Sequence, residues 1–179
     1  MIQELKMESK RDMKESGSPL VFWCYCIERR SEIMSYCAKN NPNWNGMVPR
    51  SMMLGDVTDI SHLCNFQWYE WVKFRRVGPE AAYPYPSEHL GRCLGPAMNK
   101  GNAMSQNVLL MNGKVMPVQT LRSLTETEID SELEQKKRQE FDNAIFKLYG
   151  DYKSVPPTWI RRRRKDGDQE QYLSQSTIF

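Results

Sequence analysis

The dipeptide Asn112-Gly113 is the feature that most constrains the fold of this chain. It joins two apolar runs, AMSQNVLLM before it and KVMPVQT after it. Such a pattern is typical of a β-hairpin with a two-residue type I′ turn, because both central residues of that turn need positive φ and Asn-Gly tolerates it best. The sequence therefore predicts an antiparallel hairpin with Leu110 and Val115, or their neighbours, opposite each other, and with Pro117 at an edge or a bulge.

The residues before the hairpin predict further strands. In the segment QWYEWVKF, side chains alternate so that Trp68 lies on the face opposite Tyr69 and Trp71. The segment LGRCLGPA is a second short strand with glycines that suit tight bending. Four or five short strands favour a small antiparallel barrel over residues 65–124, with Trp68 or Trp71 making its largest apolar contact. The main alternative role for these aromatic residues is a platform on which single-stranded bases stack.

Helices are predicted on both sides of this barrel. Residues 2–15 form a charged helix that Gly17 ends, and Ser18-Pro19 begins a buried amphipathic helix. Pro49 opens a short helix that Gly55 ends, and residues 125–150 form a helix with acidic residues first and basic residues later. Residues 151–179 are expected to be a disordered basic and polar tail. The apolar face of the amphipathic helix consists of Leu20, Trp23, Cys24, Ile27, Met34 and Cys37.

Composition excludes several classes of protein. The five cysteines are odd in number and without a Cys-x-x-Cys pair, so we expect reduced thiols in the cytoplasm and nucleus, with Cys24 and Cys26 buried. The two histidines lack metal-ligand spacing, so no cofactor is expected. The longest apolar run, residues 20–27, is far shorter than the roughly 20 residues of a membrane span. The net charge of +3 does not by itself identify a nucleic-acid-binding protein.

The order of short motifs resembles Copia-type retrotransposon polyproteins, at the end of the integrase core and in the SH3-like domain that follows it. The resemblance covers roughly residues 1–128. The residues that carry it are Ser18, Pro19, Phe22 and Trp23; Pro49, Gly55, Asp59, Ile60, Ser61, His62 and Leu63; Trp68, Tyr69, Trp71 and Val72; Leu90, Gly91, Arg92, Leu94, Gly95 and Pro96; Asn112 and Gly113; and Arg122, Leu124 and Thr125.

This resemblance implies an α+β chain: helices from the C-terminal end of an RNase H-like integrase core at residues 1–64, and then the SH3-like barrel. Integrases of this kind hold two Mg²⁺ or Mn²⁺ ions with two aspartates and a glutamate. The resemblance implies that the glutamate would lie just upstream of Met1 and the aspartates further upstream. We therefore expect no enzyme activity from this chain, although the parent polyprotein would be a DNA strand transferase.

Basic residues are the candidates for DNA contact. The resemblance matches Lys6 to a basic position that faces element DNA, and a spacing of four continues the same helix face. Basic residues on the barrel segment favour phosphate contact, and a basic run in the tail suggests nuclear import or nonspecific nucleic-acid binding. A solvated surface or a plain disordered tail is the alternative for each. The set comprises Lys6, Lys10, Lys14, Lys73, Arg75, Arg76, Arg92, Lys114, Arg122, Arg161, Arg162, Arg163 and Arg164.

The sequence thus predicts a non-catalytic, C-terminal integrase fragment that binds DNA weakly and without sequence preference. Its expected protein partners are other integrase subunits or polyprotein domains, and no membrane is involved. The alternative is an SH3-like interaction module that binds a peptide, because barrels of this kind serve many functions.

Overall fold

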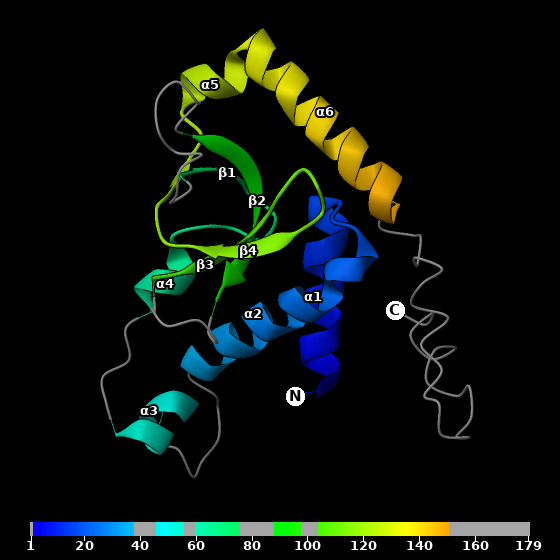
Figure 1. The fold of residues 1–179 in the computed structure, drawn as a ribbon. Coiled ribbons are helices and arrows are strands. Elements are labelled where there is room, and N and C mark those ends of the chain that lie inside the picture. The colour runs from blue at the N-terminus through cyan, green and yellow to red at the C-terminus, as the bar shows by residue number, and fades with distance from the viewer. Residues whose placement is uncertain (1, 38–45, 56–59, 76–87, 98–103, 151–179) are drawn as a thin grey trace, which may run out of the picture.

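The computed structural model describes residues 2–37, 46–55, 60–75, 88–97 and 104–150. Its N-terminal part is helical, and α1 and α2 pack against each other below the sheet in Figure 1. Gly17, at φ 66°, ends α1, and Gly55, at φ 73°, ends α3 after Pro49 has opened it, so both predicted helix ends are confirmed. The helices of this part are α1 (Ile2–Ser16), the 3₁₀ helix η1 (Leu20–Phe22), α2 (Trp23–Tyr36), α3 (Pro49–Leu54) and α4 (Ser61–Cys64).

The middle of the chain forms a five-stranded antiparallel sheet in the order β4-β3-β2-β1-β5. The first four strands are a meander, and β5 returns to pair with β1. The predicted antiparallel sheet is thus confirmed. Its closure into a barrel is not found, because β4 and β5 are the two edges of the described sheet. Pro117 lies on the edge strand β4, as expected. The strands are β1 (Trp71–Phe74), β2 (His89–Pro96), β3 (Gln106–Leu109), β4 (Val115–Val118) and β5 (Leu121–Ser123).

The predicted hairpin forms, but with a different turn. Leu109 pairs with Val115, as the hairpin requires. The amide of Gly113 donates to the carbonyl of Leu110 (2.9 Å), and the amide of Leu110 donates to the carbonyl of Lys114 (2.8 Å). Of the turn residues only Gly113 has positive φ, at 80°. This is the three-residue loop in which a β-turn is followed by a left-handed glycine, so the two-residue type I′ turn was wrong.

A second correction concerns the aromatic segment before β1. Tyr69 has φ 61°, so the strand begins only at Trp71 and the predicted alternation does not extend back to Trp68. Trp68 and Tyr69 are consequently both buried in one cluster, and Trp71 packs against the same cluster. Val72 lies in a second cluster on the other face of the sheet. The prediction that Trp68 lies opposite Tyr69 and Trp71 was therefore wrong.

The helix after Gly17 buries a different face from the predicted one. Phe22 and Cys26 enter the core, while Trp23 and Cys24 are exposed. The reason lies in the junction: Pro19 begins a 3₁₀ turn, and α2 starts only at Trp23, which rotates the face that meets α1. Ser18 does not cap this helix, because its fully buried hydroxyl accepts a hydrogen bond from the Trp68 indole (3.1 Å).

Two helices replace the single helix predicted for residues 125–150. Thr125 begins α5 (Glu126–Asp130) with a capping box that Glu128 completes. Ser131 has an extended backbone and separates α5 from α6 (Glu132–Tyr149). In Figure 1, α6 runs diagonally from α5 towards the N-terminal helices.

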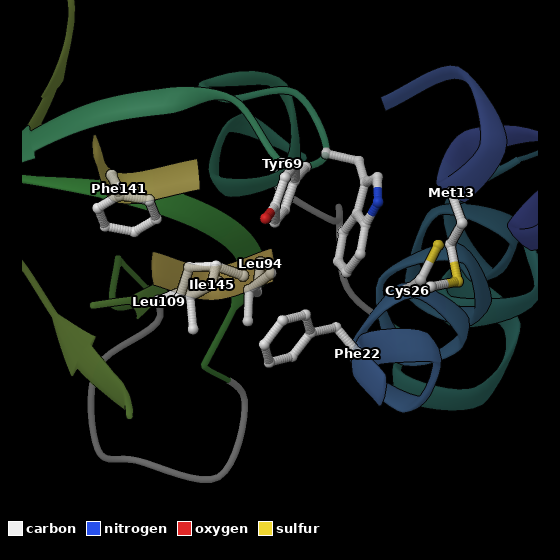
Figure 2. Close-up of a cluster of buried hydrophobic side chains, with 9 residues drawn as sticks. Met13, Phe22, Cys26, Tyr69, Leu94, Leu109, Phe141 and Ile145 are labelled. Atoms are coloured by element: carbon white, nitrogen blue, oxygen red, sulfur yellow. The ribbon is translucent and has the colours of Figure 1, made fainter. Parts of the chain in front are cut away.

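One hydrophobic cluster joins all these parts. Figure 2 shows side chains from the N-terminal helices on one side and from the strands and α6 on the other, with Tyr69 between them. The core therefore crosses the boundaries predicted near residues 64 and 124. The buried members are Met13, Phe22, Cys26, Trp68, Tyr69, Leu94, Leu109, Phe141 and Ile145.

Candidate nucleic-acid interface

The lysines of α1 form a row along its surface. Lys6, Lys10 and Lys14 are exposed and follow one another at a spacing of four, so they lie on one face of the helix. Lys10 and Lys14 make no ion pair within the part of the chain that the structure describes. Three cations on one helix face can contact successive phosphates of a nucleic-acid backbone.

Two carboxylates of α1, Glu8 and Asp12, pair with arginines rather than with this row. Asp12 accepts two hydrogen bonds from the guanidinium of Arg30 on α2, and Glu8 lies 3.8 Å from the same guanidinium. Glu8 also pairs with Arg11. The two carboxylates are therefore neutralised by arginines, and they compensate the lysine row less than the alternating charges of the sequence suggest.

A small cavity of about 30 Å³ lies between α1 and α2. Lys6 and Lys10 are among its lining residues, and Trp23, which is 37% exposed, lies on the opposite helix. The hydroxyl of Ser9 is buried there without a hydrogen-bond partner among the described residues. This places a small, mainly apolar cavity directly beside the lysine row. The lining residues are Lys6, Ser9, Lys10, Met13, Leu20, Trp23 and Ile27.

The cations predicted on β1 and β5 meet carboxylates of the same chain. Lys73 lies 2.8 Å from Glu128 and 3.4 Å from Glu134. Arg122 donates to both oxygens of Glu128, at 2.8 Å each. The hydrogen bonds from Arg122, and then from Lys73, hold the pKa of Glu128 well below its usual range, so this carboxylate stays charged.

A second carboxylate approaches the same pair of strands from the start of β2. Glu88 accepts from Arg122 at 2.7 and 3.3 Å and lies 3.9 Å from Arg75. Hydrogen bonding to Arg122 lowers the pKa of Glu88 as well. Arg75, Lys73 and Arg122 thus lie close together at β1 and β5, and carboxylates already contact all three.

Arg92 has a different environment from the other predicted cations. Its guanidinium lies 3.5 Å from the ring centre of Trp71 and 4.5 Å from that of Tyr69. It donates to the carbonyl of Tyr69 (2.9 Å) and to both oxygens of Asp142 on α6 (2.9 Å each). The guanidinium thus stacks on two aromatic rings and pairs through a single nitrogen with Asp142, which ties α6 to the sheet and makes this side chain a structural link.

Among the described residues, Lys114 lies apart from these groups, on the β3–β4 hairpin at the other edge of the sheet. Lys114 is exposed beside the hairpin turn. Arg76 and the run Arg161, Arg162, Arg163 and Arg164 lie outside the described residues. The predicted disordered tail over residues 151–179 also lies outside them.

Sequence reasoning missed two residues that form ion pairs at these sites. Arg30 pairs with Asp12, 18 positions away, and Asp142 pairs with Arg92, 50 positions away, so neither pair shows in a local pattern. Glu128 is the exception, because Thr-x-x-Glu at residues 125–128 is a capping-box signature that marks its position on a helix.

The structure describes no group of three His, Cys, Asp or Glu side chains that are placed to hold a metal ion. In the same described part, no helix is long and apolar enough to cross a membrane. Comparison with protein-family models, curated proteins and solved structures finds no match to the chain.

Proposed function

We propose that this chain binds the DNA backbone without sequence preference, as a non-catalytic part of a retrotransposon integrase. The observation that carries the proposal is the row of Lys6, Lys10 and Lys14 on α1, together with the pairing of Glu8 and Asp12 on the same helix with arginines. Backbone binding needs cations spaced along a surface and no reading of base edges. Under this proposal, the metal-dependent chemistry with Mg²⁺ or Mn²⁺ belongs to other parts of the parent integrase.

The sheet supports the second half of the proposal, an SH3-like domain within an integrase assembly. A meander whose fifth strand returns to the first is the arrangement from which a small barrel can curl, and the hairpin of β3 and β4 at one edge lies where the resemblance expects it. The helical segment and the sheet share one core, so the two parts would act as one body in contacts with other integrase subunits.

A salt titration tests the proposal. The full chain is mixed with a labelled DNA duplex of arbitrary sequence, and binding is followed by fluorescence anisotropy. Three phosphate contacts give a slope of about −2.7 in log K against log salt, which is a roughly 40-fold loss of affinity between about 50 and about 200 mM salt. The double variant Lys10→Gln with Lys14→Gln should reduce the slope by about 1.8.

The matched control is the double variant Lys136→Gln with Lys147→Gln, which removes the same charge from exposed positions on α6. The tail is present in every variant, so its contribution cancels. Equal losses in both double variants would mean that net charge alone matters and that the α1 row is not the interface. Salt-independent binding of a peptide, with no binding of DNA, would favour the alternative of a peptide-binding module.

A further inference from the structure

We infer that strands β1 and β5 carry a second binding surface for duplex DNA and that glutamates of the same chain cover it. The surface consists of Lys73, Arg75 and Arg122, and the cover consists of Glu128 and Glu134 on α5 and α6 together with Glu88. This inference rests on the proposed DNA-binding function and extends it to a surface that α5 occupies in the present structure.

The register of the sheet shows why an anion belongs at this position. Lys73 and Arg122 are directly opposite each other in the β1–β5 pair. Like charges at directly opposed positions of a sheet repel each other, so the pair needs a bridging anion. Glu128 supplies it: one oxygen lies 2.8 Å from the Lys73 ammonium and 2.8 Å from the Arg122 guanidinium.

The carboxylates occupy the positions that phosphate oxygens would take. Arg122 binds Glu128 and Glu88 through paired N–H groups, the same forked geometry with which arginine binds phosphate. Arg75 extends the cationic surface beyond Glu88. Each of the three cations therefore contacts at least one carboxylate while the cover is in place, and Lys137 also pairs with Glu134 (2.9 Å).

α5 is joined to β5 before it and to α6 after it, and apolar packing contributes little to its position. No residue of α5 is buried, although all five are described, and Leu133 in the first turn of α6 is 70% exposed. The other end of α6 is fixed, because Phe141 and Ile145 are buried in the core. The described side-chain contacts that hold α5 to the strands are therefore ion pairs, which are weak at surfaces and screened by salt. A polyanion of high charge density can replace them without disturbing the core.

The test compares two double variants that remove the same charge from the same two helices. Glu128→Gln with Glu134→Gln removes the two glutamates of the cover that lie on α5 and α6 and leaves Glu88 in place. Glu126→Gln with Glu132→Gln is the control, since its carboxylates have no ion pair within the described residues. Glutamine at position 128 preserves the capping box, so α5 keeps its start. Amide hydrogen exchange of α5 is measured without DNA, and duplex binding is measured by salt titration of the full chain.

Removing the cover should speed exchange in α5 relative to the control variant. It should also steepen the salt slope of duplex binding by about 0.9, for Lys73, which loses both of its glutamate partners, while Arg122 keeps Glu88. Any gain in affinity should then fall roughly 3.5-fold between about 50 and about 200 mM salt. Adding Lys73→Gln and Arg122→Gln to the uncovered variant should abolish the gain.

Each other outcome overturns the inference in a recognisable way. Unchanged exchange in α5 would show that these carboxylates do not hold the helix. If the Glu128→Gln, Glu134→Gln variant has the same salt slope as the wild type, and the wild type binds duplex, then the β1–β5 surface does not bind DNA. The proposed binding by the α1 row would be unaffected by that result. Absence of duplex binding in every protein would overturn the proposed function, and this inference with it.

Discussion

Replacing Trp68 with alanine tests whether the helices and the sheet unfold as one unit. Trp68 is 8% exposed, and its indole N–H donates to the buried hydroxyl of Ser18 at 3.1 Å, across 50 positions of sequence. Truncating an aromatic residue in such a core costs about 3–5 kcal/mol, from lost contacts and from the cavity that remains. That is a large share of the roughly 5–15 kcal/mol that stabilises a typical domain.

Urea unfolding, followed by far-UV circular dichroism and by fluorescence, measures this loss. With a slope of about 2 kcal/mol per molar urea, a loss of about 4 kcal/mol lowers the midpoint by about 2 M. Both signals should fall together, because Trp68 contributes to the cluster that joins helices and sheet. The matched control is Trp23→Ala, since Trp23 is 37% exposed and should shift the midpoint less than half as far.

A double-mutant cycle separates the hydrogen bond from the apolar contact. Trp68→Phe keeps an aromatic ring but leaves the Ser18 hydroxyl buried without its donor, which costs about 1–3 kcal/mol. Adding Ser18→Ala removes that hydroxyl and should restore about 1 kcal/mol or more. A midpoint shift under about 0.5 M for Trp68→Ala, or separate transitions for the two signals, would refute the shared core.

Two further predictions concern the hairpin and the thiols. Gly113→Ala should lower the free energy of unfolding by about 2–3 kcal/mol, because φ is 80° and a Cβ would lie 2.7 Å from the Tyr149 hydroxyl oxygen. In a Tyr149→Ala background, thermal unfolding should show that the same substitution costs only about 1–2 kcal/mol. An unchanged cost in that background would rule out this contact. Burial raises the pKa of the Cys26 thiol to about 12 and of the Cys93 thiol to about 11, so a thiol reagent near pH 8 should modify the three exposed cysteines quickly and these two only after denaturation. Rapid modification of all five cysteines in the native protein would contradict the assigned burial.

Local patterns predicted the elements of the fold well and their fine geometry less well. The hairpin position follows from Asn112-Gly113, but the type of turn was wrong. The carbonyl of Gly113 accepts a hydrogen bond from the Tyr149 hydroxyl (2.9 Å), and this partner lies 36 residues away. The left-handed backbone at Tyr69 is likewise invisible to a pattern of alternation, because it depends on burying two adjacent aromatic residues in one cluster.

The sequence likewise predicted one part of the candidate interface and not another. The row on α1 follows from a spacing of four along a helix, so the sequence alone predicted its geometry. The environment of Arg92 depends on Asp142, which α6 brings to it from 50 residues away. Charge in the sequence thus identified the cations, and tertiary contacts decided which of them are paired.

The contacts of Tyr149 bear on the order in which the chain assembles during synthesis. Its ring meets the ring of Phe22 at 5.3 Å, and its hydroxyl reaches the hairpin loop. The N-terminal helices and the strands leave the ribosome first, and one side of their core stays uncovered until Phe141 and Ile145 have emerged. We therefore expect the docking of α6 to complete the native state. Substitutions at its contacts would then mainly accelerate unfolding and leave the folding rate nearly unchanged.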